Sequence, residues 1–399
     1  MLTKKQMEMY ADVLLWGLKK ARIEPFKKGD VVMVQVDLPA VELAEFLHGK
    51  LLDMGVHPVM RFGKTTVMEH DFYEKSNEEQ LVFRGSWDEE LFRHLNGRIF
   101  LHAPTSLTHL ADIDPQRIGQ VAVAMKPLRD IMRKREEQGK LGWTLCSFPT
   151  DELAKQAKLT LEQYTEQIIK ACYLDQPEPV KAWEKVFNDA MEIKGWMNSM
   201  DVQYYHVASD HIDLKITPGD QRKWIGISGH NIPSFELFIS PDWRGTEGTY
   251  FANQPSFRSG NYVEGVNLTF DNGIVTEIKA EKGESFSKKQ LDMDEGASRV
   301  GEFSLTDKRF SKIDCFMAST LYDENFGGDN GNCHLAVGAS YSDTFDGDPS
   351  TLTEVKKKEL GFNDSALHWD LVNTEPKTVT AHLKSGDKVV VYENGMFKC

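Results

Sequence analysis

The chain has 399 residues and a formal net charge of −14 at pH 7, because 47 lysine and arginine residues face 61 aspartate and glutamate residues. Hydrophobic residues make up 40% of the chain, enough to build a core, and a length well above ~150 residues suggests two domains. The net negative charge, without a strong basic patch, argues against nucleic-acid binding. The chain has no apolar run of about 18 residues, so no membrane helix is predicted.

The N-terminal segment and the cysteines predict the cellular compartment. The short apolar run at residues 13–16 lies among charged residues, which is typical of an amphipathic helix rather than a signal peptide. The five cysteines are odd in number and widely spaced, with no C-x-x-C pair, so neither a disulfide framework nor a cysteine zinc site is expected. We therefore expect a cytoplasmic protein with no membrane partner.

The first half of the chain alternates between predicted strands and helices. Strands are expected at residues 31–36, 57–60, 98–102 and 143–148. The first of these is nearly all apolar, which is typical of a strand buried on both faces. Helices are predicted at 43–52 and from Asp114-Pro115, and Pro127 is expected to break or kink the second helix. The alternation favours an open parallel sheet, but no G-x-G-x-x-G follows the first strand, so no dinucleotide site is predicted.

The pattern changes to short alternating strands near residue 202. Before that point, residues 183–197 place their apolar side chains on one helix face. Period-2 alternation follows at residues 212–216, 266–270, 274–275, 379–383 and 388–392. The turn at 271–273 predicts a hairpin. We therefore expect an N-terminal open α/β sheet domain, 1–215, and a C-terminal β-rich, mostly antiparallel domain, 216–399, that carries the functional site.

Four segments of the second half carry the candidate chemistry. The chain has no H-E-x-x-H zinc helix, no G-x-S-x-G nucleophile elbow and no P-loop. The four segments contribute Glu236 in an apolar stretch, Glu302 among small residues, His334 behind a Gly/Asn-rich loop, and His368 with Asp370. The last two are spaced to lie on one face of a strand.

Each segment taken alone also has a plainer interpretation. Glu236 could face solvent from an alternating strand. The loop before His334 could cradle a phosphate, although no Lys or Arg follows it. His368 and Asp370 could be only a hydrogen-bonded pair on a sheet surface.

Taken together, these residues form a donor set for divalent metal ions. Mixed imidazole and carboxylate ligands suit a pair of ions such as Zn²⁺, Co²⁺ or Mn²⁺, which can activate water and polarise a carbonyl or phosphoryl oxygen. The residue types alone do not show whether the substrate is a peptide, another amide or a phosphate ester. The absence of Arg or Lys beside the motifs counts against phosphate esters. A non-catalytic binding protein with a structural metal is a further alternative, against which the number of candidate ligands argues.

The order and spacing of these motifs resemble a known family. The motifs are Asn231-Ile232-Pro233-x-x-Glu236, Gly301-Glu302, Glu324-Asn325, the segment GNCHLAVGASY at 331–341, and His368-x-Asp370. They are similar to those of the M29 family of thermophilic metallo-aminopeptidases, which includes aminopeptidases T, S and II. The resemblance spans essentially the full chain.

The resemblance implies a site, an activity and an assembly. The ligands of two divalent ions per chain would be Glu236, Glu302, His334, Tyr341, His368 and Asp370. A metal-activated water would release a hydrophobic, aromatic or basic residue from peptides with a free N-terminus. Glu302 and Glu324 are the candidates for moving the proton, and Tyr341 could hydrogen-bond a bound group instead of binding a metal. Family members are cytoplasmic homodimers, so a homodimer is expected here.

Overall fold

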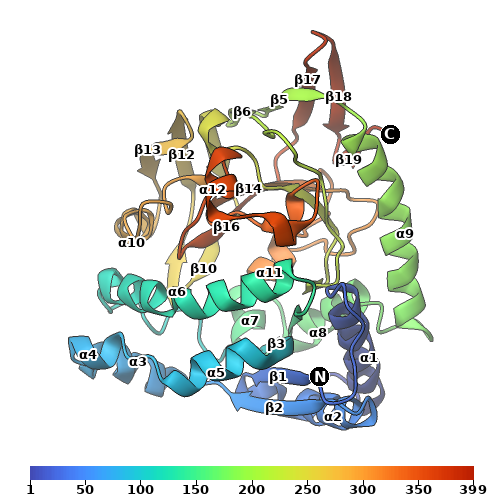
Figure 1. Cartoon of the computed structure of the whole chain (residues 1–399), viewed down its shortest axis with the longest axis vertical. Coiled ribbons are helices and arrows are strands. Elements are labelled where there is room, and N and C mark those ends of the chain that lie inside the picture. The colour runs from blue at the N-terminus through green and yellow to red at the C-terminus, as the bar shows by residue number, and fades with distance from the viewer.

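The computed structural model describes all 399 residues and is built on one parallel and two larger antiparallel sheets, with a separate two-stranded hairpin (Figure 1). The parallel sheet contains, in spatial order, β2 (His57–Phe62), β1 (Val31–Val36), β3 (Leu95–His102), β4 (Gly142–Ser147) and β7 (Asn231–Ile232). It occupies the lower half of the molecule in Figure 1, and both antiparallel sheets lie above it. The mixed architecture with parallel and antiparallel sheets is therefore confirmed.

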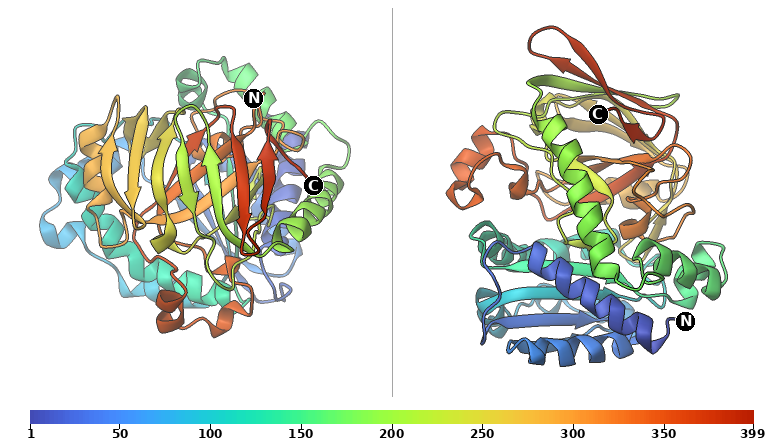
Figure 2. Two further views of the ribbon diagram at one scale, coloured as in Figure 1. Left: turned by 90° about the horizontal axis from the view of Figure 1, so that it is seen from above. Right: turned by 90° about the vertical axis from the view of Figure 1, so that its right-hand side faces the viewer.

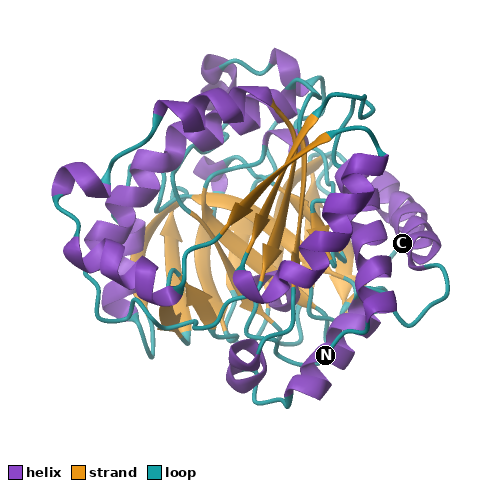
Figure 3. Ribbon diagram, turned by 90° about the horizontal axis from the view of Figure 1, so that it is seen from below, coloured by secondary structure: helices purple, strands orange, loops and turns teal.

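Helices cover the parallel sheet on both faces (Figure 3). The helices of the first half are, in chain order, α1 (Lys4–Lys20), α2 (Val41–Asp53), α3 (Thr66–Lys75), α4 (Glu78–Leu81), α5 (Ser86–His94), α6 (Pro115–Glu137), α7 (Asp151–Gln156), α8 (Leu161–Ala171) and α9 (Pro179–Asn198). Val32 and Val34 belong to the main core with residues of α1 and α2, whereas Met33 packs in a second cluster with residues of α5 and α6. The nearly continuous apolar composition of β1 follows from this burial on both sides.

The larger antiparallel sheet has eight strands. In order they are β13 (Ile274–Lys279), β12 (Val266–Asp271), β9 (Glu247–Ala252), β6 (Asp213–Ile216), β5 (Val202–Ala208), β17 (Thr378–Leu383), β18 (Lys388–Glu393) and β19 (Met396–Phe397). The view from above shows these strands side by side (Figure 2, left). The turn between β12 and β13 places Asn272 and Gly273 at positive φ (49° and 77°), as a two-residue hairpin with the right twist requires.

A smaller antiparallel sheet lies between the other two and carries the candidate site. Its order is β16 (His368–Asn373), β15 (Asn332–Gly338), β14 (Val300–Thr306) and β8 (Glu236–Ile239). The hydroxyl of Tyr250 in β9 donates to the Leu371 carbonyl of β16 (2.7 Å), which ties this sheet to the larger one. On the other side, β7 pairs with β4 in the parallel sheet, and β8 follows it after three residues. The remaining elements of the C-terminal half are the hairpin β10 (Ser256–Arg258) and β11 (Asn261–Val263) and the helices α10 (Glu284–Leu291), α11 (Thr320–Asp323) and α12 (Glu354–Glu359).

The predicted strands of the first half are confirmed, but a break of the helix at Pro127 is not. Helix α6 starts as expected, with the Asp114 side chain accepting from the Gln116 amide (2.9 Å). It then runs unbroken through Pro127 to its end at residue 137. Ile118 and Leu128 are buried on either side of the proline, so packing holds the helix together across it.

The strands of the parallel sheet are not consecutive in the chain, because two strands of the large antiparallel sheet come before its last strand. The strands β5 and β6, which end at residues 208 and 216, lie in the large antiparallel sheet, whereas β7, at residues 231–232, lies in the parallel sheet. The division into domains at 1–215 and 216–399 stays a prediction. No helix is long and apolar enough to cross a membrane.

Candidate metal centre

Four neighbouring strands of the small sheet carry five of the six predicted ligands on one face. These five are Glu236 in β8, Glu302 in β14, His334 in β15, and His368 and Asp370 in β16, whereas Tyr341 follows β15. The antiparallel register pairs Glu302 with Ala336, and Ala336 with Asp370. His334 lies two residues from Ala336 along β15. Because strand side chains alternate between faces, residues at these positions project to the same side.

The ligand side chains converge around two imidazoles. His334 Nε2 lies 3.1 Å from Glu302 Oε1 and 3.3 Å from Glu236 Oε2. His368 Nε2 lies 3.2 Å from Asp370 Oδ1 and 3.7 Å from Glu302 Oε2. Glu302 thus presents one carboxylate oxygen to each imidazole and stands between two groups of donors.

Neighbouring side chains orient these donors. The Ser304 hydroxyl donates to Glu236 Oε2 (2.9 Å). His368 Nδ1 lies 2.8 Å from the Ala339 carbonyl, which leaves Nε2 to face the carboxylates. The ring of Tyr341 packs edge-on against His368, with 4.7 Å between the ring centroids.

Glu324 directly follows α11 (Thr320–Asp323) and forms no hydrogen bond with either imidazole. Its Oε1 accepts from the side-chain amide of Asn231 (2.9 Å), and the amide of Asn325 lies at 3.5 Å. Burial raises the pKa of Glu324 well above its ordinary value, and the nearby carboxylates of Glu236 and Asp370 raise it further. It is the carboxyl group at the site that is best placed to hold a proton.

The electrostatics of the centre are those of a site built for cations. Burial raises the pKa of Glu236 to about 7, against the opposing effect of His334. Burial alone would lower the pKa of His334, but Glu236 and Glu302 raise it to about 9, and Asp370 and Glu302 likewise raise that of His368 to about 9. In the absence of a metal ion, the carboxylates thus favour the protonated form of both imidazoles.

The donor set fits divalent metal ions. Four carboxyl groups, those of Glu236, Glu302, Glu324 and Asp370, surround two histidines, and no lysine or arginine forms an ion pair with any of them. Ligand atoms of Glu236, Glu302 and His334 lie within 4.8 Å of one another. Buried carboxylates in such excess need a compensating cation, and mixed nitrogen and oxygen donors suit Zn²⁺, Co²⁺ or Mn²⁺.

The centre opens into a cavity of about 310 Å³ between the small sheet and the parallel sheet. All the predicted site residues line it, Glu324 and Tyr341 included. Phe100, Trp143 and Phe257 supply apolar walls, whereas Glu136 and Asp343 add acidic groups. The parallel sheet thus contributes Phe100 and Trp143 to the walls and the hairpin strand β10 contributes Phe257, whereas the small sheet contributes most of the reactive groups.

The structure settles some of the open interpretations of single residues. Glu236 is only 4% exposed, so its solvent-facing interpretation is wrong. His230 contacts Glu136 (2.9 Å) and Ser228 (2.7 Å) and none of the ligands. Sequence reasoning missed the contact between Ser304 and Glu236, although period-2 spacing from Glu302 put both Ser304 and Glu302 on one face.

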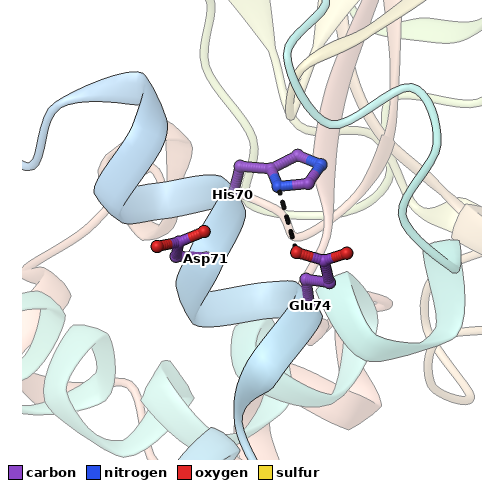
Figure 4. Close-up of side chains that lie close together, drawn as sticks. All are labelled: His70, Asp71 and Glu74. Carbon is purple, nitrogen blue, oxygen red and sulfur yellow. Dashed lines mark ion pairs between the residues drawn. The ribbon is translucent and has the colours of Figure 1, made fainter.

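A second group of possible ligands lies on the surface of α3 (Figure 4). His70, Asp71 and Glu74 come close together there. His70 Nδ1 lies 3.8 Å from Glu74 Oε2, and its Nε2 lies 3.1 Å from Asp112. The three side chains belong to one turn of an outer helix and are partly or fully exposed, as surface charge pairs commonly are.

Comparison with known proteins identifies the family of the chain. The aminopeptidase AmpS of Bacillus subtilis is 28% identical over 80% of both chains, and the aminopeptidase PepS of Streptococcus thermophilus is 25% identical over 98% of both. Wild-type AmpT from Thermus thermophilus shares the fold, with a TM-score of 0.80 at 22% identity over 99% of this chain and 100% of that one. The sequence model of the family described as thermophilic metalloprotease (M29) matches residues 3–397. The chain therefore belongs to the M29 family of metallopeptidases.

Proposed function

We propose that this metal-dependent aminopeptidase works with two divalent ions, Zn²⁺, Co²⁺ or Mn²⁺, and releases single residues from peptides with a free N-terminus. The observation that carries the proposal is the position of Glu302, whose two oxygens face different imidazoles 3.1 and 3.7 Å away. A carboxylate in that position can bridge two cations and offset their repulsion. His334 with Glu236 would hold one ion, and His368 with Asp370 the other.

The remaining site residues take roles that need no metal bond. When bound, the ions supply a Lewis acid and lower the pKa of water. In the metal-free protein Glu324 holds its proton, but bound cations would offset the neighbouring carboxylates that raise its pKa. In that ionised state Glu324, held by Asn231 at 2.9 Å, takes the proton of the attacking water and passes it to the leaving amine. Burial, with Glu302 and Asp370 nearby, keeps the pKa of Tyr341 well above its ordinary value. We therefore assign Tyr341 as a neutral donor to the oxygen of the scissile carbonyl, in preference to its predicted role as a ligand.

The walls of the cavity support the proposed residue preference. The apolar rings of Phe100, Trp143 and Phe257 suit a hydrophobic or aromatic N-terminal side chain. Asp343 and Glu136 would accept a basic one. The proposed arrangement keeps residues 1–215 as the domain that shapes the cavity and 216–399 as the catalytic domain, in a cytoplasmic homodimer.

The test compares leucyl-p-nitroanilide with its N-acetyl derivative, using protein stripped by a chelator and then reloaded with Co²⁺, Zn²⁺ or Mn²⁺. We expect cleavage of the free-amine substrate only, restored in proportion to metal up to two ions per chain. Folded protein that cleaves neither compound with any metal would contradict the proposal, and full activity at one ion per chain would contradict the dinuclear centre.

A further inference from the structure

A second cavity, of about 390 Å³, adjoins the one that holds the metal centre. The two share walls, which include Phe100, Trp143, Tyr341 and His368. Its lining is strongly basic, with the five cationic side chains Arg98, Lys126, Arg129, Arg133 and Arg258. These residues are distant from the ligand motifs in sequence, which is why no basic group was expected beside the site.

Two of these cations are neutralised within the protein. Lys126 Nζ lies 3.0 Å from Asp130 and 2.9 Å from Asp364. Arg133 lies 3.0 Å from Asp130 and 3.1 Å from Asp364. The second acidic residue in the lining, Glu136, is engaged by His230 at 2.9 Å. No acidic group of the lining is left for the other three cations.

The other three arginines have only neutral partners. Arg98 Nη2 donates to the side-chain oxygen of Gln35 (2.8 Å). Arg129 Nη2 donates to the carbonyls of Ala122 (2.9 Å) and Ala366 (3.0 Å), and Arg258 Nη1 donates to the carbonyl of His368 (2.8 Å). None of the three forms an ion pair.

Carboxylates near these arginines balance the positive charge only in part: Asp130, Asp294 and Asp364 act on Arg129, and Asp370 acts on Arg258, but none forms an ion pair with them. Two observations show that Arg98 lacks even this balance. Arg98 Nε is buried and has no hydrogen-bond partner. Burial lowers the pKa of Arg98, and the positive charge of Arg129 lowers it further. Enclosed guanidinium groups that repel one another are costly unless an anion joins them, and a carboxylate matches the paired N–H groups of arginine.

We infer that the cavity bounded by Arg98, Arg129 and Arg258, here called the arginine pocket, binds the C-terminal carboxylate of a short peptide whose N-terminal residue lies at the metal centre. The inference rests on the proposed function. The shared walls place the pocket directly beside the metal-site cavity, within reach of the rest of a short substrate whose N-terminal residue lies at the metal centre. The volume is that of a small-ligand site, so the pocket favours short peptides over long chains.

The first experiment measures kcat/KM for leucyl-glycine and for its C-terminal amide with wild-type enzyme. Because a neutral amide cannot accept charge-assisted hydrogen bonds as a carboxylate does, we expect a preference of about tenfold or more for the free acid. Equal values for acid and amide overturn the inference while leaving the aminopeptidase activity intact, whereas failure to cleave either compound contradicts the proposed function itself.

A second pair of substrates, leucyl-glutamyl amide and leucyl-glutaminyl amide, separates two sources of the carboxylate. The inference expects equal rates for these two amides. A preference for the glutamyl compound that matches the leucyl-glycine preference would assign the pocket to an acidic side chain and overturn its assignment to the chain terminus.

Variants then test which side chains create the preference. Arg98→Gln and, independently, Arg129→Gln remove one charge each, and we expect the acid-to-amide ratio to fall toward one. Arg135→Gln is the matched control, because Arg135 bonds the Leu95 carbonyl (2.8 Å) and lines neither cavity; its ratio should equal that of wild type. If both variants fold and each keeps the wild-type acid-to-amide ratio of kcat/KM, the assignment of the pocket is overturned.

Discussion

At the scale of single residues, the two candidate catalytic glutamates differ in what they touch. Glu302 faces both imidazoles, whereas Glu324 is bonded to the Asn231 amide. We expect Glu302→Gln to lose both bound metal and turnover, because an amide cannot bridge two cations. Glu324→Gln should keep its metal and lose about 10²- to 10⁴-fold in kcat, the usual contribution of a proton-transfer group.

The measurement is metal content by mass spectrometry together with kcat on leucyl-p-nitroanilide. Glu359→Gln serves as the control, since Glu359 is exposed on α12. Normal turnover in Glu302→Gln would remove the bridging assignment, and loss of metal from Glu324→Gln would make Glu324 a ligand instead.

The two site histidines also predict how the stability of the metal-free protein depends on pH. Their pKa of about 9 in the folded chain exceeds the ordinary 6.5, so their stabilising effect is complete below pH 6.5 and is lost as the pH rises through 9. The free energy of unfolding should fall over this interval by an amount on the order of 3 kcal/mol for each histidine. Added metal should recover more stability at pH 9 than at pH 6.5, because it binds neutral imidazole.

Urea unfolding of chelator-treated protein at several pH values measures this effect. His334→Gln should flatten the curve, whereas His94→Gln, on the exposed surface of α5, should leave its slope unchanged. A metal-free protein that becomes more stable from pH 6.5 to 9 would show that the carboxylates do not hold protons on these imidazoles.

At the scale of elements, the contact between α1 and the loop before β7 controls the position of Asn231. The Gly17 Cα packs against the Gly229 backbone, and a Cβ at Gly17 would lie 2.7 Å from the Gly229 carbonyl oxygen. Asn231 follows two residues later and holds Glu324. We expect Gly17→Ala to cost about 1–3 kcal/mol of stability and to lower kcat by moving this loop.

Gly49→Ala in α2 is the matched control. A Cβ there meets nothing within 4 Å, so the alanine should be neutral or stabilise the protein by up to about 1 kcal/mol through its higher helix propensity. Thermal unfolding and kcat of the two variants give the comparison. Equal stability and activity in Gly17→Ala would mean that α1 can shift without moving the site.

Several elements could be predicted from the sequence because their signals are local. The apolar run of β1 and the alternation of β12 each reflect burial by immediate neighbours. The unbroken α6 could not be foreseen, since the packing that holds it across Pro127 comes from other elements. The site follows the same rule: Glu302 stands out in its own segment, but its distance to His334 depends on strand pairing.

The arginine pocket could not be predicted from local sequence patterns. Arg98 lies in β3 and Arg258 in β10, 160 residues later, and no spacing rule joins them. Only the packing of the hairpin β10–β11 and the parallel sheet around one cavity brings their charges together. A motif search around the ligands therefore underestimates the basic character of the site.

At the scale of the whole molecule, the outer edge of the parallel sheet exposes an unusual amount of apolar surface. Helix α3 contains no buried residue, and it lies with α4 and α5 at the margin of the molecule in Figure 1. The side chains there that are between 57% and 69% exposed are Phe62, Val67, Met68, Phe83 and Trp87. Most helices are stabilised by packing an apolar face, and apolar residues gathered on a surface mark contact sites.

This surface predicts where the proposed homodimer forms. We expect light scattering to report twice the 45.4 kDa mass of one chain and the double variant Met68→Glu/Trp87→Glu to dissociate, because each new carboxylate would be buried unpaired at the interface. Val355→Glu is the matched control, since Val355 is 67% exposed on α12, away from these helices. A dimer that survives the double variant would move the interface elsewhere, and a wild-type monomer at all concentrations would leave α3 as a helix held only by its partial contacts with this chain.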